Sequence, residues 1–396
     1  MSILKCISCG AQYDISRRYF RCDKCGDLLE VVHDMEIYKP NSMKGVWRYK
    51  SLVHPELHEK FIVTRGEGDT FLYKHELISE LTGIKEIRLK HEGENPTGSF
   101  KDRGMTVAVS HGKFLGARHT ICASTGNTSA SASSYSSIAG MKSSVLIPKG
   151  KISRAKLIQS IAYGAEIVEV DGDFDSAMEN LESIVKQNQH LYTLNSLNPW
   201  RLEGQKTIFY EIMDKVKEPD FILVPAGNLG NTSALGKAIR DYYELGIINK
   251  KPRIVAIQAE GASPFYKMWH YGMDEIKPVI AETIASAIRI GNPVNWKKAK
   301  WAIKYTDGIV EAVSDSEILD AKRAIDKSGI GAEPASAASV AGAKKLKEMG
   351  IIDKSDTVVA VLTGHVLKDI DNITQIGSMI DFNTFLERIK GESKHN

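Results

Sequence analysis

The chain has 396 residues, of which 42% are hydrophobic and 26% are charged, a composition typical of a globular protein with a sizeable core. Its 52 Lys and Arg against 49 Asp and Glu leave a formal charge of only +3, too small to indicate a nucleic-acid footprint. No run approaches the roughly 20 apolar residues of a membrane span, and the charged first 18 residues do not have the pattern of a signal peptide. These properties favour a cytoplasmic enzyme of two or three domains.

Four of the five cysteines lie in the first 25 residues and form two C-x2-C pairs: Cys6, Cys9, Cys22 and Cys25. Each pair presents two sulfurs to one ion, so the two pairs can close a tetrahedral thiolate cage. Gly10 and Gly26 directly follow the pairs, where a positive φ is easily accommodated. Because four thiolates leave no coordination position open, we predict a structural Zn²⁺ site and no need for His33 as a ligand. Two disulfides are the alternative, which suits a secreted protein better.

Residues 1–35 are expected to form a small ribbon with strands at residues 19–21 and 28–32, and residues 36–75 give no clear pattern. Beyond them, short apolar or β-branched runs alternate with segments of helical periodicity. The predicted strands are residues 86–90, 120–123, 143–147, 166–170, 221–224, 253–258, 308–312 and 358–362. The predicted helices are residues 100–115, 127–138, 154–163 and 174–188, and one from about Thr232. This alternation predicts an α/β architecture with mostly parallel sheets.

The first of three Gly-rich or hydroxyl-rich loops follows the strand at residues 86–90 and reads GENPTGSFKDRG over residues 93–104. Lys101 opens the following helix, where the positive end of the helix dipole disfavours a cation. We therefore expect a depressed pKa for Lys101, which suits an imine or base catalysis. The alternative is a solvated lysine paired with Asp102.

The second and third loops have the character of anion cradles. ASTGNTS at residues 123–129 places hydroxyls around a helix start, where backbone N–H groups bind a carboxylate or phosphate; an ordinary N-cap is the alternative. PAGNLGNTS at residues 225–233 has two glycines that let backbone amides face a phosphate; a plain turn is the alternative. The third loop is neither a Walker motif nor G-x-G-x-x-G. Together the loops suit a phosphorylated cofactor and an anionic substrate.

These motifs resemble the threonine synthase family, pyridoxal-phosphate enzymes of the tryptophan synthase β-like fold (fold type II). The resemblance runs from about residue 64 to residue 370. Its motifs are NPTGSFKDRG (95–104), STGNT (124–128), GNLGN (227–231), QAEG (258–261), AIRIGNP (287–293), EPASA (333–337) and LTGHVLKD (362–369). One departure is GEGDTFL at residues 66–72, where the family usually has Thr-Pro-Leu. The change alters a turn but removes no catalytic group.

The resemblance implies two α/β domains with the cofactor in the cleft between them, beside a small N-terminal zinc ribbon at residues 1–35. The larger, pyridoxal-phosphate-binding domain is expected to comprise residues 36–104 and 201–396. The smaller domain, at residues 105–200, is expected to close over the substrate. The implied cofactors are pyridoxal 5'-phosphate and structural Zn²⁺. The implied assembly is a cytoplasmic homodimer that acts on a small molecule and binds neither nucleic acid nor membrane.

The resemblance also assigns residues to roles. Lys101 would bond covalently to the cofactor and serve as the base, Asn127 would hydrogen-bond the phenolic oxygen, and Thr363 would face the pyridine nitrogen. The cofactor phosphate would be held by Gly227, Asn228, Leu229, Gly230 and Asn231. The substrate carboxylate and its neighbouring groups would be held by Ser124, Thr125 and Thr128, and the substrate phosphate by Asn195, Ser196 and Arg201. For Arg201 the alternative is a surface arginine that caps a helix.

The implied reaction converts O-phospho-L-homoserine and water into L-threonine and phosphate, the last step of threonine biosynthesis. The nearest alternative is a cysteate synthase, which acts on O-phosphoserine, shorter by one methylene, and sulfite. Threonine dehydratase and cysteine synthase share the lysine and Asn-Gly loops, but the Arg201 phosphate site argues against the dehydratase. A ribbon that binds nucleic acid, attached to a catalytically silent domain, is an alternative of another class.

Overall fold

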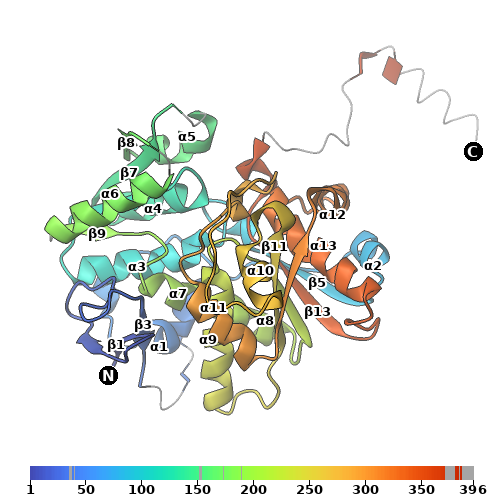
Figure 1. Ribbon diagram of the computed structural model, residues 1–396, viewed down its shortest axis with the longest axis horizontal. Helices are drawn as coiled ribbons and strands as arrows, with labels where there is room; N and C mark the ends of the chain where they lie inside the picture. Colours follow the sequence, from blue (N-terminus) through green and yellow to red (C-terminus); the bar gives the residue numbers. More distant parts are fainter. Residues whose placement is uncertain are drawn as a thin grey trace, which may run out of the picture.

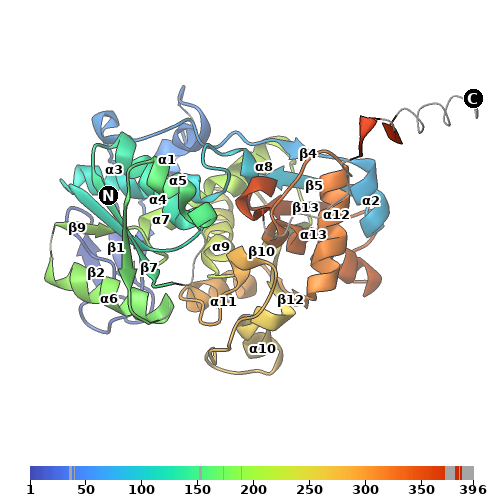
Figure 2. The ribbon, with the colours of Figure 1, turned by 90° about the horizontal axis from the view of Figure 1, so that it is seen from above.

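The computed structural model describes residues 1–34, 38–39, 41–150, 154–172, 174–188, 190–370, 380–382 and 384–385. Its strands form three sheets, with the orders β2-β1-β3, β12-β11-β10-β13-β5-β4 and β8-β7-β6-β9. In Figures 1 and 2 the four-stranded sheet lies on the left and the six-stranded sheet on the right. The predicted α/β class is confirmed. Within the described residues, no helix combines the length and the apolar character that crossing a membrane requires.

The six-stranded sheet forms the larger half of the fold. Its strands are β4 (Leu72–Tyr73), β5 (Glu86–His91), β10 (Phe221–Pro225), β11 (Arg253–Ala259), β12 (Ile309–Val313) and β13 (Thr357–Leu362). All neighbours run parallel except β4, which is antiparallel to β5. Strands β10, β11 and β13 are buried almost throughout. Burial on both faces explains their continuous runs of Val, Ile, Leu and Ala.

Helices cover both faces of this sheet. On one face, apolar side chains such as Ile78, Ile325 and Leu346 pack into the core from α2 (Glu76–Thr82), α12 (Asp315–Lys327) and α13 (Pro334–Glu348). On the other face, Leu235 and Ile303 belong to a second core that receives α8 (Thr207–Lys215), α9 (Gly230–Glu244), α10 (Pro264–His270) and α11 (Trp296–Tyr305).

The four-stranded sheet is entirely parallel and consists of β6 (His119–Ala123), β7 (Lys142–Pro148), β8 (Glu166–Val170) and β9 (Leu191–Thr193). Helix α6 (Phe174–Gln187) packs Leu181 against Ile121 of this sheet. Helix α4 (Asn127–Ile138) also packs on β6 and β7, and it contacts α3 (Lys101–Phe114) and α5 (Arg154–Ala162), while α3 contacts α7 (Trp200–Gln205). All four strands fall within the residues predicted for the smaller domain, whose limits remain a prediction.

The N-terminal module is an antiparallel sheet of β1 (Ile3–Cys6), β2 (Gln12–Asp14) and β3 (Leu29–Val32). The strand expected at residues 19–21 is wrong, because only Arg21 pairs there, in a single bridge to Leu28. Strands β1 and β2 were not predicted, because strands of three or four residues show little alternation and only β3 stands out through its Leu and Val residues. The predicted module boundary, between residues 35 and 36, lies outside the described residues.

The described part of the chain between this module and β4 contains only short helices. They are η1 (Gly45–Tyr49), α1 (Lys50–Val53) and η2 (Glu59–Phe61). Their apolar side chains, such as Trp47 and Leu52, join the same core as α9 and α11. Elements of three to five residues are too short to show a helical period, which is why no clear pattern could be recognised over residues 36–75.

Candidate active site

The carboxyl ends of parallel strands from both large sheets face one cavity of about 1630 Å³. This edge of a parallel sheet is where ligands bind in α/β proteins. The residues predicted to contact cofactor or substrate come from the connections after β5, β6, β9, β10 and β13. All of them line the cavity: Lys101, Ser124, Thr125, Asn127, Thr128, Asn195, Ser196, Arg201, Gly227, Asn228, Leu229, Gly230, Asn231 and Thr363.

Lys101 is the first residue of α3, and its Nζ lies 4.1 Å from the centre of the Phe100 ring. Burial in the protein, reinforced by the nearby positive charge of Arg201, lowers the pKa of Lys101 to about 7. A large fraction of this amine is therefore uncharged at neutral pH. An uncharged amine at the wall of a cavity can act as a nucleophile or as a base.

The alternative in which Lys101 is solvated and paired with Asp102 is wrong. The Asp102 carboxylate is fully buried and accepts hydrogen bonds from the backbone N–H of Thr97 (2.6 Å), the Thr97 hydroxyl (2.6 Å) and the Ser131 hydroxyl (2.5 Å). Burial raises the pKa of Asp102 to about 6. Asp102 thus holds the loop before Lys101 against α3 and α4, while Lys101 faces the cavity.

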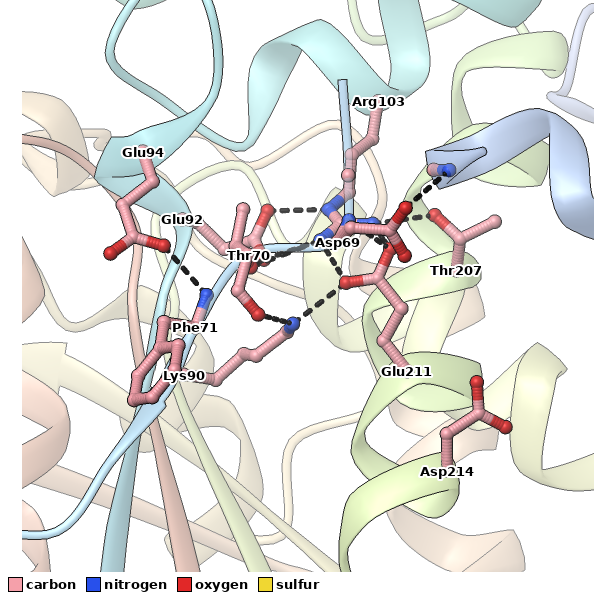
Figure 3. A network of polar contacts seen from close by, with 12 residues as sticks. Asp69, Thr70, Phe71, Lys90, Glu92, Glu94, Arg103, Thr207, Glu211 and Asp214 are labelled. Carbon is pink, nitrogen blue, oxygen red and sulfur yellow. Dashed lines mark hydrogen bonds and ion pairs between the residues drawn. The ribbon is translucent and has the colours of Figure 1, made fainter. Parts of the chain in front are cut away.

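A buried network of charged side chains holds the start of α3 in place (Figure 3). Arg103 Nε lies 2.5 Å from Glu92 Oε2, and Arg103 Nη1 lies 2.7 Å from Glu211 Oε1. Lys90 Nζ also lies 2.7 Å from the second oxygen of Glu211. These ion pairs tie β5 and α8 to the helix that begins with Lys101.

The segment that departs from the family pattern, residues 66–72, is anchored by the same network. The Thr70 hydroxyl donates to Glu92 (2.8 Å), and the Gly68 N–H donates to Asn95 Oδ1 (3.0 Å). Figure 3 shows Thr70 beside Glu92 and Phe71 next to Glu94. The Phe71 N–H donates to Glu94 Oε2 at 2.6 Å, a hydrogen bond that a proline there could not make.

The loop at residues 227–231 leads into the 15-residue helix α9, which begins at Gly230 and not at the predicted Thr232. Leu229 has a φ of 62°, so the chain makes its turn there, and the helix starts directly after it. Asn228 holds the loop in place, because its Nδ2 donates to the Ser196 hydroxyl (3.0 Å) and its Oδ1 accepts from the Val294 N–H (2.7 Å).

This loop fits a phosphate group. The buried Asn231 side chain has no hydrogen-bond partner for either its Nδ2 or its Oδ1 among the described residues. A side chain on Gly227 would place its Cβ 2.9 Å from Ile288 Cα, so the residue has to be small. Unpaired donors at the N-terminus of a long helix favour an anion.

Arg201, on α7, is 3% exposed, so the alternative of a surface arginine is wrong. Its Nη1 donates to the Leu194 carbonyl (3.1 Å), and its Nε has no partner among the residues that the structure describes. No ion pair joins it to an acidic group in the described part of the chain. Burial lowers its pKa to about 10. A buried cation without a counter-charge is costly, and an arriving phosphate would supply one.

Asn195, which was predicted to contact the substrate phosphate, is occupied by other groups. Its Oδ1 accepts from the Ala123 N–H and its Nδ2 donates to the Ala123 carbonyl, both at 2.9 Å. Its Nδ2 also lies 3.2 Å from Met178 Sδ. The side chain therefore joins the ends of β6 and β9, with no donor left for a ligand.

Glu333 is a site residue to which the sequence assigned no role. The structure buries it in the cavity wall, where its carboxylate accepts from Asn127 Nδ2 (2.9 Å) and from the Thr363 hydroxyl (3.2 Å). Burial raises the pKa of Glu333. The motif EPASA could have indicated this residue. Its glutamate directly precedes a run of small residues that are buried in α13, and a charged residue is rarely buried unless it has a partner.

The four N-terminal cysteines come together as predicted. Their Sγ atoms all lie within 4.8 Å of one another, with Cys6 to Cys25 at 3.4 Å and Cys9 to Cys22 at 3.5 Å. These separations are too long for disulfides, and a tetrahedral ion with metal–sulfur bonds of about 2.3 Å needs sulfurs roughly 3.8 Å apart.

The turns around this cluster also follow the prediction. Gly10 and Gly26 have φ values of 72° and 75°, a conformation that favours glycine. His33 lies outside the cluster and bonds Ser2 and Glu203 instead. The cluster can therefore hold one metal ion with cysteine ligands alone.

Comparisons with known proteins agree with this geometry. Residues 63–364 match the family described as "Pyridoxal-phosphate dependent enzyme". The threonine synthase of Methanocaldococcus jannaschii is 46% identical, with 93% of each chain covered. That of Methanosarcina acetivorans is 44% identical, with 99% of each chain covered. This chain belongs to the threonine synthase family of pyridoxal-phosphate dependent enzymes.

Solved structures of this larger group share the fold. The crystal structure of threonine synthase from Escherichia coli has a TM-score of 0.74 at 18% identity, and covers 96% of this chain and 92% of its own. Maize serine racemase has a TM-score of 0.65 at 20% identity, with 90% and 99% covered. The prediction of fold type II is confirmed, and membership of the family makes pyridoxal phosphate the expected cofactor.

Proposed function

We propose that this threonine synthase family member converts O-phospho-L-homoserine and water into L-threonine and phosphate, as a carbon–oxygen lyase acting on phosphate. The observation that carries the proposal is the pairing of two groups in one cavity. Lys101 offers an amine with a pKa of about 7, and Arg201 offers a buried guanidinium whose Nε is unpartnered among the described residues. The relatives named threonine synthase, which match this chain over nearly its whole length, support the choice of substrate.

Pyridoxal phosphate, when bound, supplies an electron sink for the negative charge that develops at the substrate Cα. We assign its covalent attachment to Lys101, its phenolic oxygen to Asn127 and its ring nitrogen to Thr363. The backbone and side chains that would hold its phosphate are Gly227, Asn228, Leu229, Gly230 and Asn231. The unpartnered Asn231 amide and the absence of space for a side chain on Gly227 support this assignment.

The substrate is held at its two anionic ends. Arg201 and Ser196 would bind the phosphate, while Asn195 keeps the strand ends in register. The hydroxyls and N–H groups at the start of α4 would bind the carboxylate and its neighbouring groups, through Ser124, Thr125 and Thr128. Holding both ends places the carbons between them beside Lys101.

Lys101 Nζ then moves the protons. Since its pKa is close to 7, it can accept a proton from Cα and from Cβ at neutral pH and return protons to Cγ and to Cα. Phosphate leaves from Cγ, and water adds at Cβ. No second base is required in this scheme, and Lys101→Ala is expected to abolish turnover.

A substrate panel tests the proposal. The purified protein, loaded with pyridoxal phosphate, is given O-phosphohomoserine or O-phosphoserine, and both phosphate and the amino-acid product are measured. Phosphate and threonine from O-phosphohomoserine alone are expected. Phosphate from O-phosphoserine alone, with cysteate formed when sulfite is added, would instead identify a cysteate synthase.

We further propose that the four-cysteine cluster binds a structural Zn²⁺ and that the protein works as a cytoplasmic homodimer. The spacing of the sulfurs supports the metal. The dimer and the compartment rest on the resemblance to the family. Metal analysis of the purified protein and light scattering test the metal and the dimer.

A further inference from the structure

Glu333 lies where two predicted cofactor contacts meet. One carboxylate oxygen accepts from Asn127 Nδ2 at 2.9 Å, and the other accepts from Thr363 Oγ1 at 3.2 Å. The two partners come from different sheets, since Asn127 follows β6 and Thr363 follows β13. Glu333 therefore connects the two halves of the cavity wall through a single buried side chain.

Glu333 packs closely against the backbone of Gly364. Glu333 donates its backbone N–H to the Gly364 carbonyl at 3.0 Å. A side chain on Gly364 would place its Cβ only 2.5 Å from the Glu333 carboxyl carbon. The carboxyl group therefore lies directly against Gly364, and its two oxygens are held by the hydrogen bonds from Asn127 and Thr363.

This contact decides how the Asn127 amide is turned. A carboxylate only accepts hydrogen bonds, so Asn127 must direct its NH₂ group, and not its carbonyl oxygen, toward Glu333. The second N–H of the same NH₂ group and the carbonyl oxygen are thereby fixed in direction. If the acceptor at residue 333 became a donor, the amide would be free to turn over.

Thr363 is subject to the same control, because a hydroxyl has one proton to give. Its neighbours are Glu333 Oε1 and Ser336 Oγ (3.1 Å), and Ser336 in turn accepts from the Gly364 N–H (2.9 Å). While Glu333 is ionised, Thr363 donates to it and presents only lone pairs to the cavity. When Glu333 carries a proton, it can donate to Thr363, whose own proton is then free for the cavity.

We propose that Glu333 is a positioning residue that sets the hydrogen-bond polarity with which Asn127 and Thr363 face pyridoxal phosphate. The inference rests on the proposed roles of those two residues. The cations that act on Glu333 from the cavity side are Lys101 and Lys368. Glu333 itself is assigned no contact with the substrate.

The variant Glu333→Gln tests this inference. It keeps the size of the side chain but replaces one acceptor oxygen with an NH₂ donor, so the hydrogen bond to either Asn127 or Thr363 must reverse its direction or be lost. We expect the visible absorbance band of the bound cofactor to shift and its dissociation constant to rise about tenfold, the effect of losing one hydrogen bond to a charged group. Both are measured without turnover, by spectrophotometric titration of the cofactor-free protein.

Glu182→Gln is the matched control. Glu182 is another carboxyl group of the cavity lining, and it pairs with Arg21 at 2.7 Å and not with Asn127 or Thr363. Its substitution is expected to leave the band and the dissociation constant as in the unmodified protein. A folded Glu333→Gln variant with unchanged band and unchanged affinity would overturn the inference.

If Glu333→Gln fails to fold, the variant Glu333→Asp tests the same inference. It keeps both acceptors but withdraws them by one methylene, so a smaller shift of the band and a weaker affinity are expected. An unchanged band and affinity in this variant would equally overturn the inference. Failure of the unmodified protein to form a visible band with pyridoxal phosphate would instead overturn the proposed function.

Discussion

At the scale of the residue, the protonation of Lys101 governs how the cofactor is attached. Only the neutral amine attacks an aldehyde, and a pKa of about 7 makes the neutral fraction rise with pH until it is nearly complete about one unit above. We expect the rate of cofactor uptake by the cofactor-free protein to rise about tenfold per pH unit below 7 and to level off near pH 8. Stopped-flow absorbance gives this profile. A rate that still climbs toward pH 10 would identify an ordinary, solvated lysine.

Arg201 is the residue whose chemistry selects the anionic end of the substrate. Arg201→Lys keeps the charge but loses the planar fork that binds two phosphate oxygens at once. We expect kcat/KM for O-phosphohomoserine to fall by about 10- to 100-fold, which corresponds to about 1.4–3 kcal/mol. Phosphate release measures it. Arg253→Lys, outside the cavity lining, is the control, and equal activity of the two variants would contradict the assignment.

At the scale of the element, the start of α3 depends on the buried cluster of Arg103, Lys90, Glu92 and Glu211 (Figure 3). Glu211→Gln would leave Arg103 and Lys90 with Glu92 as the only carboxylate of the cluster. Breaking such a pair from one side leaves a buried, uncompensated charge, so we expect a loss of about 3 kcal/mol in the free energy of unfolding. Urea denaturation followed by circular dichroism measures it.

The control for that experiment is Glu86→Gln. Glu86 pairs with Lys74 at 2.6 Å, but both side chains are substantially exposed. Surface pairs contribute little, so a change below about 1 kcal/mol is expected. A comparable loss in both variants would mean that the buried cluster has no special part in holding α3.

At the scale of the whole molecule, the N-terminal module is attached to both halves of the fold. Arg21 pairs with Glu182 of α6 at 2.7 Å, on the side of the four-stranded sheet. On the other side, Asp27 pairs with Lys297 at 2.5 Å, and Lys298 of α11 donates to the Leu29 carbonyl at 2.7 Å. The module is therefore joined to both halves of the fold, and in Figures 1 and 2 it lies on the left, on the side of the four-stranded sheet.

This attachment predicts the effect of losing the metal. Cys9→Ser should reduce zinc content and lower the melting temperature by about 5 °C or more, because metal binding and folding of such a module are linked. Zinc released to a chromophoric chelator and a thermal melt measure the two effects. Cys122→Ala, which alters a buried thiol outside the cluster, is the control and should retain the zinc. An unchanged melting temperature after zinc loss would contradict the linkage.

Much of this molecule follows from local sequence. The parallel strands can be recognised in the sequence as short apolar runs, because a strand buried on both faces contains few polar residues. The cysteine cluster follows from two C-x2-C pairs, and Lys101 from its place at the start of a helix. The predicted start of α9 was less accurate. The turn before this helix is made by Leu229 in a left-handed conformation that leucine rarely adopts, so the sequence does not indicate it.

The sequence by itself determined the α/β class, the family and a part of the cavity lining that includes Lys101, Asn127 and Arg201. Only the tertiary structure decided the relations among them: that Asp102 turns away from Lys101, that the Asn195 amide is already satisfied, and that Glu333 joins Asn127 to Thr363. Local patterns arise from neighbours along the chain, whereas these contacts join residues brought together only by the packing of two sheets. The charge state and hydrogen-bond direction of each group depend on that packing.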